Sequence, residues 1–433
     1  VGVDGNSYAP FASADDFQMF VDLNAGLDGR PPPGARWSTV AEYLALFEGK
    51  VSVNVAYVIG NSALRIAAVG WEDRRPTSSE VRKQQDLLRQ GMREGAFGLS
   101  TGLTYPPGSY ASTEELAELC KTVAGLGGIY VTHVRYTLGD RFLDPFREAI
   151  EIGRRSGVPV HISHYHTPVP GGARKLLTLV DQARGEGLDV TFDSYSYPYT
   201  STRLVAVLPE WAHDGGPRRL AERMRDPKER ARMAADPDFA EQDFNGVLVT
   251  HFSLPQHKRF EGWSLAAIAG ALGKSLIDTL CDLLLEEEWN LSYIGVRGNP
   301  VNIRQFYQHP AHVGGSDALL LGDRPNPRTY GCYPLVLGDF CREEGALDLP
   351  QAIRKMTSLP AARLGLSDRG ILRDGFLADL VVFDPQRVAT KATLERPKQF
   401  PEGIDYVIVN GKVVIDGGRH TGAYPGRALR LGG

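Results

Sequence analysis

The sequence predicts an α/β fold in which a barrel of repeated βα units is followed by a small β domain. Between Thr77 and about Thr200, stretches with helical periodicity end at glycine and are followed by short apolar runs. Several of these runs end at a polar or ionisable residue, as expected where the strands of a barrel converge on one cleft. After about Leu364 the pattern changes to strand candidates without intervening helices.

The first clear unit begins at Ser112, which forms a candidate capping box with Glu115 before apolar residues at helical spacing. We expect this helix to end at Gly125 or Gly127 because glycine commonly terminates helices. A β-rich run follows and leads directly into His133.

The second unit has Asp144 as its expected N-cap and Pro145 at the first helical position. Its helix should extend to about Gly157. The strand candidate 158–164 follows and ends at His164. A histidine therefore ends the strand in both units.

Two later strand candidates also end at ionisable residues. The run 188–193 ends at Asp193, and the run 246–250 leads into His251. The intervening segment 203–243 is rich in Arg, Asp, Pro and Ala, and we interpret it as a helical insertion or lid.

The C-terminal part contains strand candidates at 378–384 and on both sides of Asn410-Gly411. An Asn-Gly pair between apolar residues is typical of a type I′ hairpin. We therefore expect a barrel domain over residues 1–364 and a small β domain over residues 365–433.

Composition restricts the function. The 433 residues carry 48 Lys and Arg against 52 Asp and Glu, so the formal net charge is −4 and nucleic acid is not expected as the main partner. Four cysteines without C-x-x-C spacing favour a reducing, cytoplasmic location. No apolar run is long enough to span a membrane. The chain begins with Val1 rather than Met, which is consistent with a processed or truncated product.

His133 and His164 are candidate metal ligands. They end neighbouring βα units 31 residues apart, so both imidazoles can face one Zn²⁺ ion at about 2 Å. On spacing alone, a purely structural role for both is equally compatible. Asp317 follows a short strand in a Gly-rich loop, where it can be either a helix cap or a carrier of protons.

Several long motifs occur in order along the chain. They are VGVDGNSYAP (1–10), GLSTGLTYPPG (98–108), THVR (132–135), ISH (162–164), YSYPY (195–199), GSD (315–317), PRTYG (327–331), MTSLPA (356–361), ADLV (378–381) and PGR (425–427). In these motifs the chain resembles the N-acyl-D-amino-acid deacylases (D-aminoacylases) of the amidohydrolase superfamily.

The resemblance implies a distorted TIM (β/α)8-type barrel with an appended small β-sandwich. It also implies zinc-dependent hydrolysis of the N-acyl amide of N-acyl-D-amino acids, with one or two Zn²⁺ ions. His133 and His164 match the two zinc histidines of the family, and Asp317 matches its catalytic aspartate. The implied partner is a small-molecule substrate, and a homo-oligomer is compatible with the sequence.

The resemblance also indicates substrate-binding residues. Tyr105 and Arg328 match groups that hold the substrate carboxylate, and Ser201 lies in a stretch that can add a hydroxyl to the same pocket. His166 stands where the family has a lysine. Without the resemblance, Arg328 would be interpreted as a surface arginine pairing with Asp323, and Tyr105 as a packing residue in a Pro-Gly turn.

The chain departs from the family in three further respects. No His-x-His occurs before His133, so we expect the second metal position, the first barrel strand and half of the sandwich to be missing. Asp4 stands where well-studied members have a cysteine ligand. Since a carboxylate is harder than a thiolate, it should bind zinc less tightly or favour a bridged two-metal site. Asn326 replaces a histidine before the Pro-Arg pair.

The expected mechanism uses zinc on Asp4, His133 and His164 to lower the pKa of water and to polarise the amide carbonyl. Asp317 would move the proton to the leaving amine. One alternative is a cyclic-amide hydrolase of the dihydroorotase or hydantoinase type, although no lysine ends a predicted barrel strand. The other is an inactive fragment or a metal-binding scaffold.

Overall fold

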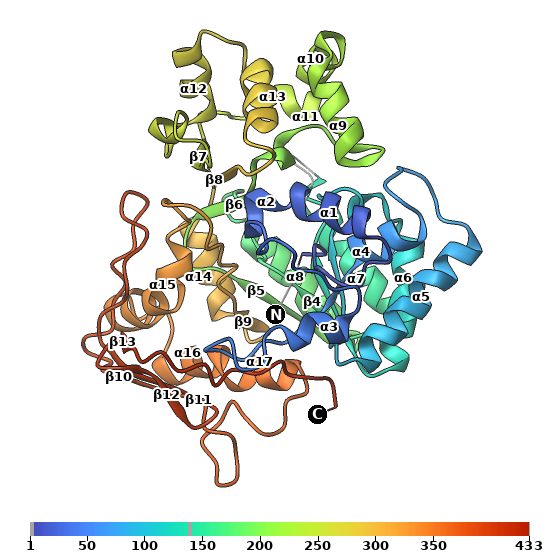
Figure 1. Cartoon of the computed structure of the whole chain (residues 1–433). Helices are drawn as coiled ribbons and strands as arrows, with labels where there is room; N and C mark the ends of the chain where they lie inside the picture. Colours follow the sequence, from blue (N-terminus) through green and yellow to red (C-terminus); the bar gives the residue numbers. More distant parts are fainter. Residues whose placement is uncertain (1–3, 137–140, 433) are drawn as a thin grey trace.

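A parallel sheet of six strands forms the centre of the protein (Figure 1). The computed structural model describes residues 4–136 and 141–432, so the first three residues of the N-terminal motif lie outside it. The strands occur in the order β1-β2-β3-β4-β5-β9. Their bounds are Ile59–Gly60 (β1), Gly98–Gly102 (β2), Ile129–His133 (β3), Val160–Ile162 (β4), Val190–Ser194 (β5) and His312–Gly314 (β9). This arrangement confirms the predicted distorted barrel.

Helices connect the parallel strands and cover the outside of the sheet (Figure 1). They are α4 (Asn61–Ala68), α5 (Ser78–Arg93), α6 (Thr113–Gly125), α7 (Asp144–Ser156), α8 (Gly172–Gly185) and α14 (Pro300–Gln308). A buried apolar core joins sheet and helices, and it includes Leu116, Tyr130, Ile162, Phe192 and Phe306. All neighbouring strands of the sheet are parallel, so the six strands present their carboxyl ends at the same edge.

Two predicted helix starts need correction. Ser112 caps α6 by accepting from the Glu115 main-chain N–H, but the Glu115 side chain does not return to it. That carboxylate instead forms a buried ion pair with Arg65, at 2.8 Å, so no capping box forms. In α7 the N-cap is Leu143, and Asp144 is the first helical residue rather than the cap.

The strand ending at His251 does not belong to the barrel. It is β7 (Val247–His251), which pairs antiparallel with β8 (Ser292–Val296), and β8 pairs antiparallel with β6 (Tyr199–Arg203). The prediction that His251 ends a barrel strand was therefore wrong. An apolar run of this length has the same composition in either sheet, so the sequence did not distinguish them.

Five helices pack with this three-stranded sheet on one side of the barrel (Figure 1). They are α9 (Gly216–Arg225), α10 (Pro227–Ala234), α11 (Pro237–Ala240), α12 (Leu265–Leu272) and α13 (Leu276–Glu286). The first three lie within segment 203–243. Its role as a lid stays a prediction, as does the domain boundary at residue 364.

Further helices precede the first barrel strand in the sequence or follow the last one. They are α1 (Ala14–Leu23), α2 (Ala25–Asp28), α3 (Val40–Ala45), α15 (Arg328–Leu335), a π-helical turn over Val336–Glu343, α16 (Leu349–Met356) and α17 (Ser358–Arg363). None of the described helices combines the length and the apolar character that crossing a membrane requires.

The C-terminal strands form a four-stranded antiparallel sheet, which represents the appended β-sandwich part. Its strands are β10 (Leu380–Phe383), β11 (Ile404–Val409), β12 (Lys412–Asp416) and β13 (Arg419–His420). Between β11 and β12, Asn410 and Gly411 have φ of 47° and 78°. Both values are positive, as a type I′ turn requires, so the predicted hairpin is confirmed.

Candidate metal centre and active site

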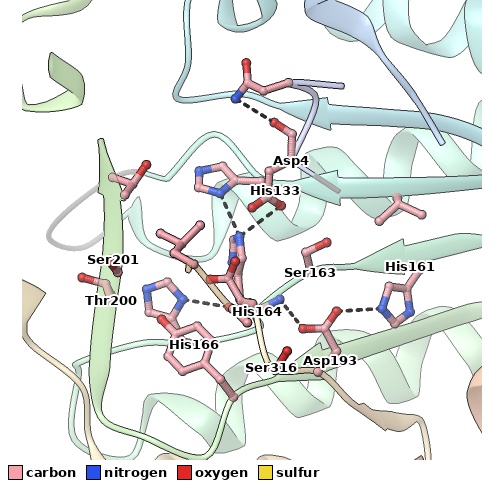
Figure 2. Close-up of a pocket in the computed structure, with 18 of the residues that line it drawn as sticks. Asp4, His133, His161, Ser163, His164, His166, Asp193, Thr200, Ser201 and Ser316 are labelled. Carbon is pink, nitrogen blue, oxygen red and sulfur yellow. Dashed lines mark hydrogen bonds and ion pairs between the residues drawn. The ribbon is translucent and has the colours of Figure 1, made fainter. Parts of the chain in front are cut away.

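Three potential metal ligands meet at the carboxyl ends of the parallel strands (Figure 2). His133 is the last residue of β3, His164 follows β4 by two residues, and Asp4 arrives from the N-terminal loop. Nδ1 of His133 lies 2.8 Å from Nε2 of His164, which lies 3.3 Å from Oδ1 of Asp4. Within residues 4–136 and 141–432, these three form the one group whose ligand atoms all lie within 4.8 Å of one another.

The loop that carries Asp4 crosses directly over two strand ends. A Cβ added to Gly102 would lie 2.0 Å from the Asp4 carbonyl oxygen, and one added to Gly60 would lie 2.4 Å from the Gly5 carbonyl oxygen. The Gly5 N–H also donates to Ser100 Oγ, at 3.2 Å. Because no side chain fits at either strand position, the glycines allow the approach that brings the Asp4 carboxylate to the two histidines.

Three side chains of the site are attached to left-handed backbone. Asp4, His164 and Asp317 have φ of 68°, 34° and 45°. Non-glycine residues rarely adopt this region, and such conformations cluster at functional sites because the surrounding structure enforces them. The site is therefore held in a geometry that the local sequence alone does not favour.

The three side chains suit a metal cation. Oδ1 of Asp4 is buried and has no hydrogen-bond donor. The other ring nitrogens of the histidines contact hydroxyls, since Thr104 Oγ1 lies 2.6 Å from His133 Nε2 and Tyr136 Oη lies 3.0 Å from His164 Nδ1. When those nitrogens carry the protons, the nitrogens that face Asp4 are free to act as ligands. A buried carboxylate and two oriented imidazoles are the donor set that Zn²⁺ accepts.

The pKa values of the two histidines also favour a metal site. Burial, with the neighbouring imidazole of His164, holds the pKa of His133 well below its usual value, so His133 is neutral. Burial also lowers the pKa of His164, but the carboxylates of Asp4, Asp317 and Asp193 together outweigh it and raise this pKa to about 9. The ring of His164 is therefore protonated near neutral pH, and a bound metal would replace that proton.

A cavity of about 820 Å³ opens onto this group. Its described lining includes all three potential ligands and the predicted residues Asp317, Tyr105, Ser201 and His166. Arg328 is not among the described residues that line it. The structure thus gathers seven of the eight predicted site residues around one space.

Arg328 lies behind Asp317 instead. Its Nη2 donates to Asp317 Oδ2, its Nε donates to the Asp317 carbonyl oxygen at 2.8 Å, and its Nη1 donates to the Tyr199 carbonyl oxygen at 3.1 Å. The alternative of a surface pair with Asp323 was wrong, because Arg328 is buried and Asp323 contacts Lys398 at 3.2 Å. Burial raises the pKa of Asp317 to about 6 although Arg328 opposes this rise.

Comparisons with known proteins assign the family. A model described as amidohydrolase family matches residues 33–415. The D-aminoacylase of Alcaligenes xylosoxydans xylosoxydans is 34% identical over 430 residues, which cover 98% of this chain and 79% of the relative. The chain belongs to the amidohydrolase family. An N-acyl-D-aspartate deacylase of the same organism is 33% identical over 93% of this amidohydrolase and 74% of its own length.

Solved structures of relatives place the amidohydrolase within the D-aminoacylase branch. The N-acyl-D-glutamate deacylase of Bordetella bronchiseptica, complexed with zinc and a phosphonate mimic of the tetrahedral intermediate, matches with a TM-score of 0.80. It is 30% identical, and the match covers 99% of this chain and 81% of the other. A D-aminoacylase structure has a TM-score of 0.79 and 32% identity, with 99% and 82% covered.

The remaining predicted residues of the amidohydrolase have local partners. Ser201 donates to the Tyr293 carbonyl oxygen, at 2.9 Å. Nδ1 of His166 lies 2.8 Å from the His164 carbonyl oxygen, and burial with the nearby His164 lowers the pKa of His166 to about 4. His166 is therefore neutral, unlike the lysine of the family. Asn326 is buried and accepts from the Arg328 main-chain N–H, at 3.1 Å.

Sequence reasoning missed several residues of this amidohydrolase site. Thr104 and Tyr136 contact the two histidines, and Tyr136 follows His133 by three residues, which was the available signal. Asp193 was recognised as a strand end but received no role. It contacts the His164 turn and pairs with His161 (Figure 2).

Proposed function

We propose that this amidohydrolase is an N-acyl-D-amino-acid deacylase that uses Zn²⁺ to hydrolyse the N-acyl amide, releasing a carboxylate and a D-amino acid. The observation that carries the proposal is the convergence of Asp4, His133 and His164 on the cavity that also contains Asp317. The names of the relatives, which include D-aminoacylase and N-acyl-D-aspartate deacylase, supply the substrate class.

Asp4, His133 and His164 would hold the metal. When bound, Zn²⁺ supplies Lewis acidity that activates water and polarises the amide carbonyl. Thr104 and Tyr136 keep the two imidazoles oriented through their second nitrogens. Because Asp4 provides oxygen rather than sulfur, the site should hold zinc less tightly than one with a thiolate ligand.

Asp317 is the proposed general acid and base. It takes the proton of the attacking water and delivers it to the amide nitrogen, so that the amine leaves uncharged. A carboxyl group whose pKa lies near 6 can do both close to neutral pH. Arg328 holds this carboxylate at the cavity wall through its three hydrogen bonds to Asp317 and Tyr199.

Tyr105, Ser201 and His166 are the proposed contacts of the substrate carboxylate within the cavity, whereas Arg328 lies behind Asp317. These hydroxyls and the neutral imidazole provide no fixed positive charge, and the protons on Ser201 Oγ and His166 Nδ1 already face the Tyr293 and His164 carbonyl oxygens. The carboxylate contact should therefore be weaker here than in relatives with lysine at position 166. Fixing this group defines which face of the amide meets Asp317, and this supports selection of one configuration.

The proposal is tested by metal analysis of the purified chain together with paired hydrolysis assays. We expect zinc to co-purify and N-acetyl-D-amino acids to be cleaved in preference to their L-isomers. A hydantoin serves as the cyclic-amide comparison. Faster cleavage of the hydantoin, or equal rates for both enantiomers, would contradict the proposed substrate class. Absence of metal binding would contradict the proposed centre.

A further inference from the structure

The carboxylate of Asp193 lies beside the main chain of His164, between this ligand residue and His161 (Figure 2). Asp193 is the fourth residue of β5, and its Oδ1 accepts from the main-chain N–H of His164, at 2.7 Å. The main-chain carbonyl of Asp193 accepts from the next N–H, that of Tyr165, at 2.6 Å. Two consecutive N–H groups of the ligand turn therefore end on one residue.

These bonds act on a strained turn. His164 has φ of 34°, and the left-handed region is unfavourable for a residue other than glycine. A charged acceptor at a main-chain N–H is among the stronger hydrogen bonds in proteins. Asp193 therefore offsets the strain at the residue whose imidazole must point at the metal.

Asp193 also contacts the loop of Asp317. A Cβ added to Gly315 would lie 2.7 Å from Asp193 Oδ1, so the main chain two residues before Asp317 packs against the carboxylate. Oδ1 of Asp193 therefore lies between the turn that carries His164 and the loop that carries Asp317.

The second carboxylate oxygen of Asp193 is held by His161. Oδ2 of Asp193 lies 2.9 Å from His161 Nε2, and His161 Nδ1 lies 2.8 Å from Thr191 Oγ1. Both oxygens are therefore engaged with the protein. Asp193 is not part of the ligand group found among the described residues, which contains Asp4, His133 and His164.

We infer that Asp193, oriented by His161, is a positioning residue that holds the His164 ligand turn against the Asp317 loop. The inference rests on the proposed function because it assigns Asp193 to the same metal centre. It predicts an effect on metal binding as well as on turnover, since a displaced His164 presents its imidazole in the wrong direction.

The main test measures Co²⁺ affinity by competition with a chelator and records the visible absorption spectrum of the Co²⁺ form. For Asp193→Ala we expect a 10- to 100-fold weaker affinity, the range typical of lost partners of metal ligands, and an altered spectrum. Asp193→Asn should recover affinity to within a few-fold, because its amide oxygen still accepts from His164 and its amide nitrogen can donate to His161. Asp189→Ala, just before the start of the same strand, is the matched control and should leave both readouts unchanged.

Gly315→Ala is a second test of the same contact. In this variant Asp193 and all the groups that bind its carboxylate are still present. Its new methyl would crowd the Asp193 carboxylate, so we expect weaker Co²⁺ binding although residue 315 is not one of the potential ligands. Unchanged affinity and spectrum in either Asp193→Ala or Gly315→Ala would overturn the inference, as would an Asp193→Asn variant that is as impaired as the alanine variant. If the unsubstituted chain binds no metal, the proposed function fails and the inference fails with it.

Discussion

The guanidinium of Arg328 is bound to the side chain and the main chain of Asp317. A third bond, to the Tyr199 carbonyl oxygen, fixes the guanidinium from the other side. Arg328 is fully buried there, and its planar group also lies 4.1 Å from the ring centre of Tyr195. The position of Asp317 at the cavity wall therefore depends on a cation that lies behind it.

Replacing Arg328 should affect turnover more than recognition of a carboxylate. For Arg328→Met we expect kcat to fall by on the order of 10² on both an N-acetyl-D-amino acid and its carboxamide, because Asp317 loses its partner. Metal content should stay unchanged. A loss confined to the acid substrate would instead favour direct contact between Arg328 and the substrate carboxylate.

Replacing the proposed proton carrier should separate catalysis from metal binding. Asp317→Asn keeps the shape of the side chain but cannot exchange a proton, so kcat should fall by on the order of 10² or more. The zinc content, measured by atomic emission, should equal that of the unsubstituted chain. Near-normal turnover would return Asp317 to a purely structural role.

Loss of either histidine should remove zinc and activity together. His133→Ala and His164→Ala each delete one of the three ligands that the described structure brings together. His420→Ala is the control because His420 is exposed in the C-terminal sheet, on β13. Full zinc occupancy in the His133 or His164 variant would exclude that residue from the site.

The buried ion pair between Arg65 and Glu115 should be important for stability rather than chemistry. Both side chains are almost fully buried, and Gln84 also donates to Glu115, at 2.9 Å. Glu115→Ala leaves a buried guanidinium without its carboxylate and should lower the free energy of unfolding by about 3–5 kcal/mol. Urea denaturation measures this change. If the double variant Arg65→Met, Glu115→Leu were no more stable than Glu115→Ala, the unpaired charge would not be the cause.

The barrel and the pairing of the two histidines were predictable because both depend on local periodicity. Strand-end histidines in neighbouring βα units must converge when the strands are parallel, and His133 and His164 do lie 2.8 Å apart. Their role as ligands stays a prediction. The hairpin at Asn410-Gly411 was predictable for the same reason. A type I′ turn needs two consecutive positive φ angles, and an Asn-Gly dipeptide adopts them readily.

The features that the sequence did not predict depend on contacts between distant segments. The run ending at His251 joined an antiparallel sheet because β8, more than 40 residues later, supplied its partner. The Glu115 side chain pairs with Arg65, which is 50 residues earlier, instead of completing the predicted capping box. The partnership of Arg328 with Asp317 and the role of Asp193 likewise depend on side-chain orientation, which no spacing rule reports.

The crossing of the Asp4 loop over Gly60 and Gly102 has a mechanical consequence. A metal shared by Asp4, His133 and His164 would fasten the start of the chain to two strands far away in sequence, in the manner of a removable cross-link. Chelation should then release the segment around Asp4 before the barrel itself melts. We expect the stripped protein to be cut near its N-terminus by a dilute protease and to melt at a lower temperature, and added Zn²⁺ should reverse both effects.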